Sequence, residues 1–176
     1  MNGQERGGPG EQDGTGPILV SACLAGIACR FDGSARPLEP LVRMVREGKA
    51  IPVCPEVLGG LPTPRAIAEI RPGKGRVFTS RGEDVTEAFT RGAQEVLRLA
   101  RAARARLAVF KERSPSCGVH QVYDGTFQGR IVPGRGIATA ALVAEGIKVV
   151  SDEEFTKGQG REGRGTPGPA GPEPSR

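Results

Sequence analysis

The sequence contains few aromatic and imidazole side chains. Its 176 residues include no tryptophan, one tyrosine, six phenylalanines and one histidine, His120. Proteins that bind single-stranded nucleic acid stack its bases on aromatic side chains, so this composition argues against nucleic acid as a partner. A single histidine also cannot complete a conventional histidine-based zinc site. Any metal in this protein must therefore rely on other ligands.

Long apolar runs are absent as well. No stretch of about 18 apolar residues occurs, which argues against a transmembrane helix, and the N-terminus lacks the basic and apolar regions of a signal peptide. We therefore expect a cytoplasmic protein that has no membrane partner. Thiols stay reduced in that compartment, so the four cysteines favour metal binding or catalysis over disulfides.

The two ends of the chain lack any apolar pattern. Residues 1–17 are rich in glycine, glutamine and acidic residues, and residues 158–176 consist mainly of glycine, proline, arginine and glutamate. Such segments cannot offset the entropy of ordering, so we predict two disordered tails. Residues 18–157 have the common size of one compact domain. The formal net charge of +5 is compatible with an anionic small ligand.

Short apolar strands alternate with helices between the predicted tails. The strands are expected at 18–22, 50–53, 107–110 and 147–150, with a hairpin around 72–75. Apolar spacing and capping residues predict helices at 38–47, from 83 to about 101, at 137–145 and after Ser151. This alternation predicts a single Rossmann-like α/β domain of three layers, with a mostly parallel sheet and helices on both faces.

Three of the four cysteines follow the ends of predicted strands. Cys23 follows the first strand, Cys54 follows the second, and Cys117 lies seven residues after the strand 107–110. Ligands of an open parallel sheet bind outside the carboxyl ends of its strands, so we expect the three thiols to meet in one site. Their spacing is not that of a zinc finger or ribbon. Three thiolates without an obvious fourth protein ligand indicate an iron–sulfur cluster with one open iron.

Five motifs resemble those of the thiouracil desulfidase family, and together they cover essentially residues 18–155. In chain order they are Ser21–Gly26, Cys54–Pro62, Gly82–Thr86, Ser114–Gly118 (Ser-Pro-Ser-Cys-Gly) and Tyr123–Phe127 (Tyr-Asp-Gly-Thr-Phe). The resemblance implies a 4Fe-4S cluster held by Cys23, Cys54 and Cys117, whose fourth iron binds the sulfur of a thiolated pyrimidine. It also implies a non-redox hydrolysis of thiouracil, or of its nucleoside or nucleotide, in which C=S becomes C=O and hydrosulfide leaves.

The same motifs contain candidate catalytic residues. Glu56 lies two residues after Cys54, where its carboxylate can reach a water or a ring nitrogen as a general base. A solvated loop glutamate is the alternative. Ser114 and Ser116 can orient substrate or relay a proton, or they can simply cap the loop. The resemblance points to Glu56 and to one of these serines as catalytic, and the sequence leaves the choice of serine open.

Cys29 supports a second interpretation. As a fourth ligand it would close the site and indicate a non-enzymatic cluster protein, for electron transfer or redox sensing. Beside it, the turn Arg30–Gly33 is more typical of an anion-binding arginine. Residues 133–136 precede a helix and offer N–H groups to a phosphate. A third interpretation, tRNA thiolation, is disfavoured because the sequence contains no P-loop and no separate tRNA-binding domain.

Overall fold

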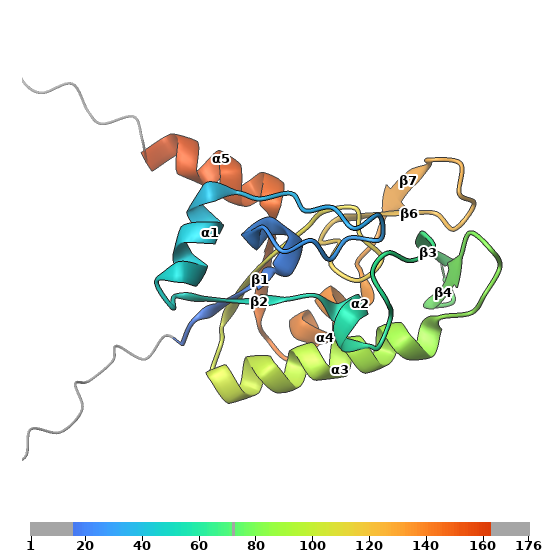
Figure 1. Cartoon of the computed structure of the whole chain (residues 1–176), viewed down its shortest axis with the longest axis horizontal. Coiled ribbons are helices and arrows are strands. Elements are labelled where there is room, and N and C mark those ends of the chain that lie inside the picture. Colours follow the sequence, from blue (N-terminus) through green and yellow to red (C-terminus); the bar gives the residue numbers. More distant parts are fainter. Residues whose placement is uncertain (1–15, 72, 163–176) are drawn as a thin grey trace, which may run out of the picture.

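A four-stranded parallel sheet forms the centre of the protein (Figure 1). The computed structural model describes residues 16–71 and 73–162. The strand order is β2-β1-β5-β8, and the bounds are Ile18–Ser21 for β1, Ala50–Val53 for β2, Leu107–Phe110 for β5 and Lys148–Ser151 for β8. Each neighbouring pair is parallel. The predicted mostly parallel α/β sheet is thereby confirmed.

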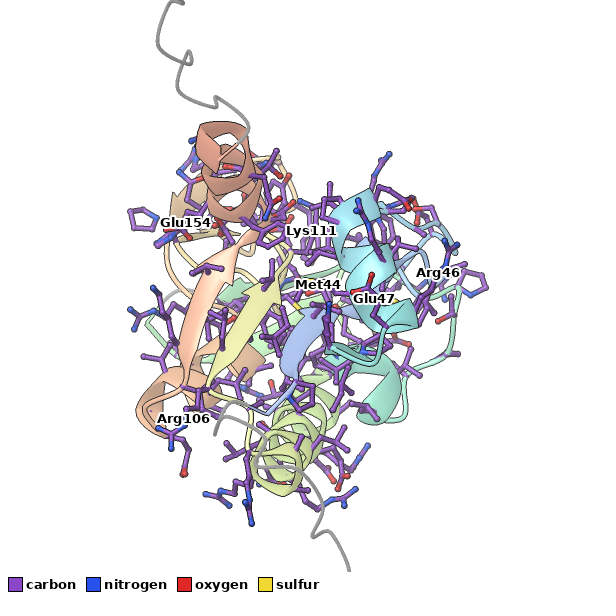
Figure 2. The ribbon with its side chains drawn as sticks, turned by 90° about the vertical axis from the view of Figure 1, so that its left-hand side faces the viewer. Met44, Arg46, Glu47, Arg106, Lys111 and Glu154 are labelled. Atoms are coloured by element: carbon purple, nitrogen blue, oxygen red, sulfur yellow. The ribbon has the colours of Figure 1, made fainter. Side chains whose placement is uncertain are left out.

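Helices cover both faces of this sheet (Figure 2). In β1, Leu19 packs toward α3 (Thr86–Ala103) and α4 (Ile137–Ala144), while Val20 packs toward α1 (Glu39–Arg46) and α5 (Asp152–Glu162). Successive side chains of a strand point to opposite faces, so a continuous apolar strand is buried on both sides. The result is the three-layer arrangement that the alternation of strands and helices predicted.

The two longest helices begin where local side chains define their first turn. In α3, the Asp84 carboxylate accepts the Thr86 N–H at 3.0 Å, and Asp84 pairs with Phe78, which delays the helix from the expected residue 83 to Thr86. In α5, Ser151 and Glu154 form the predicted reciprocal capping box, at 2.7 and 3.1 Å.

The boundary expected at residue 157 lies inside α5, which continues to Glu162. At the other end, residues 16 and 17 of the expected first tail belong to the described part, while residues 1–15 and 163–176 lie outside it. Within residues 16–71 and 73–162, no helix combines the length and the apolar character that crossing a bilayer requires.

Two antiparallel hairpins stand beside the carboxyl end of the sheet (Figure 1). The first pairs β3 (Ala68–Arg71) with β4 (Arg76–Thr79), as predicted, and the second pairs β6 (Gln121–Tyr123) with β7 (Ile131–Pro133). A small apolar core joins them to α3; its buried members are Ile70, Val77, Phe89 and Val122. Two single-turn helices, η1 (Ala22–Ala25) and α2 (Pro55–Leu58), start the segments that follow β1 and β2.

Candidate active site

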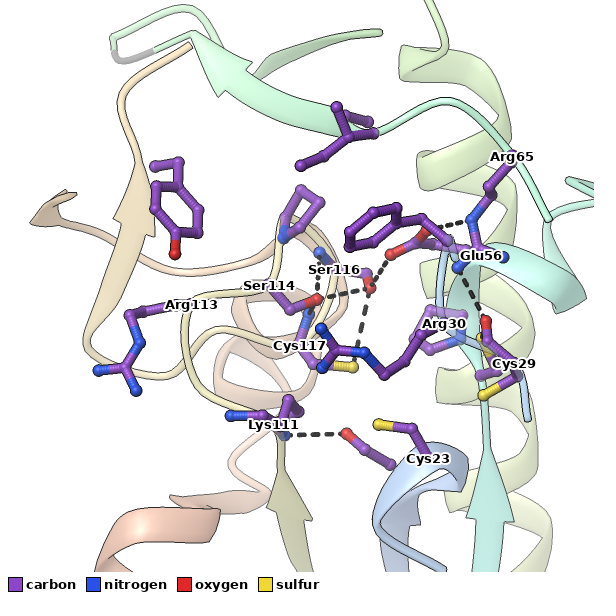
Figure 3. A pocket seen from close by; sticks show the side chains of 18 of the residues that line it. Cys23, Cys29, Arg30, Glu56, Arg65, Lys111, Arg113, Ser114, Ser116 and Cys117 are labelled. Carbon is purple, nitrogen blue, oxygen red and sulfur yellow. Dashed lines mark hydrogen bonds and ion pairs between the residues drawn. The ribbon is translucent and has the colours of Figure 1, made fainter. Parts of the chain in front are cut away.

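A cavity of about 680 Å³ lies at the carboxyl end of the sheet (Figure 3). A pocket of this size is typical for a small organic ligand. The structure brings every site residue predicted from the sequence into its wall, namely Cys23, Cys54, Glu56, Ser114, Ser116 and Cys117. Cys29 also lines the cavity, and all four cysteines are free thiols.

Cys23 occupies the single turn of η1, directly beyond β1. Gly26 ends this turn with a φ of +90°, a conformation that glycine adopts readily. The chain then returns across the turn, where the Arg36 N–H donates to the Cys23 carbonyl at 2.9 Å. The Cys23 and Cys117 side chains point toward one another across the cavity (Figure 3).

Cys54 and Glu56 are placed by a close contact between α2 and α3. A side-chain carbon at Gly92 would stand 1.9 Å from the Pro55 carbonyl oxygen, and one at Gly59 would stand 2.1 Å from the Ala88 oxygen. Only glycine permits so close an approach of the two backbones, because a Cβ atom at either position would clash with the carbonyl oxygen. The packing therefore fixes α2, and with it the carboxylate of Glu56.

The loop that carries Cys117 is held by the first turn of α4. The N–H groups of Ile137 and Ala138 donate to the carbonyls of Pro115 and Ser116 at 2.9 and 3.0 Å. The Thr139 hydroxyl donates to the Cys117 carbonyl at 2.8 Å. These helix N–H groups, which we expected to be available to a phosphate after residues 133–136, are thus occupied by the loop. The phosphate interpretation of that segment is wrong.

Sequence reasoning missed a buried carboxylate that closes the same loop. One oxygen of Glu112 accepts the N–H groups of residues 119, 120 and 121 at 2.9, 3.0 and 3.0 Å. Asp152 holds the Glu112 N–H at 2.8 Å and pairs with the Lys111 ammonium at 2.9 Å. A Lys-Glu pair after a strand carries no pattern that distinguishes a buried carboxylate from a solvated one.

Both oxygens of the Glu56 carboxylate have protein partners (Figure 3). Ser116 Oγ donates to Oε1 at 3.1 Å, and Arg65 Nε donates to Oε2 at 2.5 Å. The Glu56 side chain is only 12% exposed, so it is not a solvated loop residue. Arg65, which sequence reasoning also missed, reaches further and donates through Nη2 to the Cys29 carbonyl at 3.0 Å.

The two serines have different surroundings. Ser114 Oγ accepts the N–H groups of Ser116 and Cys117 at 3.2 and 3.0 Å, and it therefore caps the loop. Ser116 is buried, and its hydroxyl lies 3.2 Å from that of Ser114 and 3.7 Å from Cys117 Sγ. The hydroxyl of Ser116 consequently connects Ser114, the Glu56 carboxylate and a thiol.

The thiols of Cys29, Cys54 and Cys117 are stabilised in their neutral form. Burial raises the pKa of Cys117 to about 12. A hydrogen bond with the Cys23 thiol raises the pKa of Cys29 to about 11. A hydrogen bond with Cys29, followed by burial, raises the pKa of Cys54. Binding of a cationic metal centre would displace these protons, because only thiolates act as ligands.

The thiol set fits an iron–sulfur cluster better than a single ion. Within the described ranges, no three histidine, cysteine, aspartate or glutamate side chains are close enough together to hold one metal ion. Cys23, Cys54 and Cys117 instead stand around the wall of one cavity. Cluster thiolates each bind a different iron, and soft sulfur ligands are those that iron–sulfur clusters use.

Comparison with known proteins assigns the chain to a family. A family model described as 2-thiouracil desulfurase matches residues 18–154, which is most of the chain. The chain belongs to this family. The resemblance predicted from the five motifs is confirmed, and the match spans β1 to the start of α5.

Two relatives of this chain illustrate the family. The uncharacterized protein YbbK of Bacillus subtilis is 43% identical over 146 residues, which span 78% of this chain and 97% of the relative. Among solved structures, the 4Fe-4S-dependent thiouracil desulfidase TudS is 43% identical and superposes with a TM-score of 0.77, covering 81% of this chain and 95% of that one.

Proposed function

We propose that this protein is a 4Fe-4S-dependent desulfidase of thiolated pyrimidines such as thiouracil. The reaction is a hydrolysis: water and the C=S compound give the C=O compound and hydrogen sulfide, with no change in oxidation state. The observation that carries the proposal is that three cysteine thiols and the Glu56–Ser116 pair line one cavity. The 4Fe-4S-dependent thiouracil desulfidase that superposes on this chain supports it.

Cys23, Cys54 and Cys117 are the proposed cluster ligands. They come from three different loops, so the cluster is held by the sheet edge as a whole rather than by one segment. When bound, the cluster supplies an iron without a protein thiolate, which acts as a Lewis acid toward the substrate sulfur. The Ser116 hydroxyl, which donates to Glu56, lies 3.7 Å from Cys117 Sγ and therefore borders that ligand directly.

Glu56 is the proposed general base. Its carboxylate takes a proton from the water that attacks the thiocarbonyl carbon, while the Arg65 guanidinium, at 2.5 Å, holds the carboxylate in place. The C–S bond then breaks, and a proton is delivered to the leaving hydrosulfide. Ser116 Oγ lies 3.1 Å from Glu56 and 3.2 Å from the hydroxyl of Ser114, so the two serines form a path for that proton.

An arginine donor without a hydrogen-bond partner at the cavity supports a nucleotide as the substrate form. Arg30 extends across the cavity toward Cys117 and Ser114 (Figure 3). Its buried Nε is the one side-chain N or O atom, among the buried atoms of the described residues, that lacks a hydrogen-bond partner. A buried donor that has no acceptor is energetically costly. A phosphate oxygen of a nucleotide would supply that acceptor. Arg36 also lines the cavity, as do Lys111 and Arg113, whose charges are paired with Asp152 and Glu153 at 2.9 and 2.5 Å.

Anaerobic turnover tests the proposed function. Protein reconstituted with iron and sulfide should convert 2- and 4-thiouracil, 4-thiouridine and its 5′-monophosphate into the oxo compounds, with one hydrosulfide released per thiocarbonyl lost. In ¹⁸O-labelled water the new carbonyl should carry the label. A reconstituted protein that desulfurises none of the four compounds would show the proposal to be wrong, and unlabelled product would exclude hydrolysis.

A cluster closed by Cys29 is the second candidate, and one observation favours it. Cys29 is buried beside the other thiols, and the Cys54 thiol donates to its carbonyl at 3.8 Å. A four-thiolate cluster leaves no iron for substrate and indicates electron transfer or redox sensing. Cys29→Ala separates the two: our proposal expects cluster and turnover to be retained, whereas loss of the cluster would favour the closed site.

A further inference from the structure

One wall of the cavity is formed by a loop that the proposed chemistry does not use. The loop is the turn after β6, residues 123–127, and it belongs to the Tyr-Asp-Gly-Thr-Phe motif. Glu69 of β3 reaches across to it, and its Oε2 accepts the N–H groups of Gly125 and Phe127, both at 3.0 Å. Glu69, Tyr123 and Phe127 all line the cavity.

Glu69 is an unusual residue to find in this position. It is only 5% exposed, and a buried carboxylate is unfavourable unless hydrogen bonds satisfy it. Its two N–H donors come from the loop alone, so the carboxylate and the loop depend on each other. The contact joins the two hairpins at the cavity, where β3 packs beside β6.

The loop holds Phe127 in a strained backbone conformation. Its φ is +59°, in the left-handed region that bulky side chains rarely adopt. Such strain persists where the surrounding structure enforces it, and it concentrates at functional sites. Here the Glu69 carboxylate enforces it through the Phe127 N–H. Gly125 has a φ of +82°, and a side-chain carbon there would stand only 3.0 Å from the Ile70 carbonyl oxygen, so glycine allows the close approach.

We propose that Phe127 is the surface on which the pyrimidine ring of the substrate packs, and that Glu69 is the positioning residue that fixes it. The inference rests on the proposed function for the identity of the ligand. An aromatic side chain on the cavity wall stacks on any pyrimidine, because every base has a π-face. The strained backbone holds that ring as a fixed wall of the cavity, so its contribution is affinity for the base.

Substitutions at Phe127 separate the ring from the strain. Phe127→Asn removes the ring but keeps a residue that tolerates the left-handed conformation. We expect KM for the thiolated pyrimidine to rise by about tenfold, the loss typical of one base–aromatic stack. The value of kcat and the cluster absorption should stay within about twofold, and Phe127→Tyr should retain the wild-type KM. Equal KM values for wild type and Phe127→Asn would overturn the inference.

Glu69 should act through Phe127 and not by itself. Glu69→Ala should raise KM to a similar extent, and Glu69→Gln should restore part of the loss because its amide oxygen can accept the same N–H groups. The double variant Glu69→Ala, Phe127→Asn should be no worse than either single variant, since residues in one contact are not additive. Asp84→Ala, which removes a carboxylate that accepts the Thr86 N–H at 3.0 Å outside the cavity wall, is the matched control and should leave KM unchanged.

A binding measurement distinguishes failure of this inference from failure of the proposed function. The chain contains no tryptophan, so Phe127→Trp introduces a single reporter at the proposed stacking position. Uracil, which cannot be desulfurised, should change the fluorescence of the reconstituted variant and saturate it. Saturable binding without thiouracil turnover would contradict the proposed reaction and uphold the ring site. Wild-type turnover with no fluorescence response would contradict the ring site alone.

Discussion

The two ends of the parallel sheet are built differently. At the amino end, the three connections from helix to strand each span three residues, 47–49, 104–106 and 145–147. Each contains a residue in the left-handed conformation: Gly48, Arg104 and Gly146. At the carboxyl end, the segments that follow β1, β2 and β5 are residues 22–38, 54–85 and 111–136, and they carry every thiol of the chain.

The short connections and the long segments lie at opposite ends of the sheet (Figure 1). We therefore expect substitutions at the amino end to change stability and those at the carboxyl end to change the chemistry. The short connections join α1, α3 and α4 to the next strand through three residues each, a common length for such loops. The long segments place the cavity residues, and they are held by buried polar contacts such as those of Glu112 and Glu69. Four substitutions test the comparison, from the largest expected effect to the smallest.

Cys117→Ala should have the largest effect. It removes a proposed ligand from the carboxyl end without altering the sheet, so protein reconstituted under anaerobic conditions should retain no cluster and show no turnover. Iron and acid-labile sulfide analysis measures the loss, and circular dichroism checks that the fold persists. Stoichiometric iron and sulfide in this variant would exclude Cys117 as a ligand.

Glu56→Gln should keep the cluster and lose the reaction. Glutamine preserves shape and removes the base, so the rate should fall by about a hundred- to ten-thousand-fold, with an unchanged visible spectrum. Ser116→Ala and Ser114→Ala, made separately, measure the contribution of each hydroxyl to the same rate. Wild-type turnover by Glu56→Gln would contradict the role of the carboxylate.

Gly136→Ala, at the carboxyl end, should lower both stability and turnover moderately. A methyl group there would stand 2.4 Å from the Ser116 carbonyl carbon, so the loop carrying Ser116 and Cys117 must shift. Forced overpacking of this kind costs about 1–3 kcal/mol, which thermal unfolding measures. Turnover should fall by about tenfold or more, because small misplacements of catalytic groups are costly. Unaltered turnover would show that the loop tolerates movement.

Gly146→Ala should have the smallest effect and should change stability alone. The φ of Gly146 is +77° and nothing lies within 4 Å of a side-chain carbon built there, so the cost is backbone strain of about 1–2 kcal/mol. The melting temperature should fall by a few degrees while turnover per cluster stays constant. A fall in turnover at constant cluster content would contradict the expectation that the amino end of the sheet affects stability alone.

The sequence was sufficient to predict the sheet and the meeting of the candidate site residues in one cavity. Strands β2 and β5 begin and end where their apolar runs do, at residues 50–53 and 107–110. The parallel arrangement then places whatever follows them at one edge, which is why Cys54 and Cys117 could be assigned to the same cavity. Local patterns also located the capping box of Ser151 and Glu154.

The partners of the site residues could not be predicted in this way. Arg65 lies in a segment rich in glycine and proline, and nothing local indicates that it pairs with Glu56 nine residues earlier. Glu69 and Glu112 contact backbone N–H groups that exist in that geometry only after the hairpins and loops have folded. The expectation of a phosphate at the helix start, residues 137–139, was wrong for the same reason. The sequence predicts that a helix start has free N–H groups, but it does not show that the carbonyls of a distant loop accept them.

The contact of Gly92 with the Pro55 carbonyl has a consequence for how this family can vary. The backbone of α3 is in direct contact with the backbone of α2 at Pro55. The position of α3 therefore determines how deep Cys54 and Glu56 lie in the cavity. An inserted residue between Thr86 and Gly92 would rotate the contact surface by about 100° and present a side chain where only backbone fits. Length changes beyond Ala100 leave that register intact. Cys54, the proposed cluster ligand, and Glu56, the proposed base, therefore keep their spacing as long as this one helical position keeps its glycine.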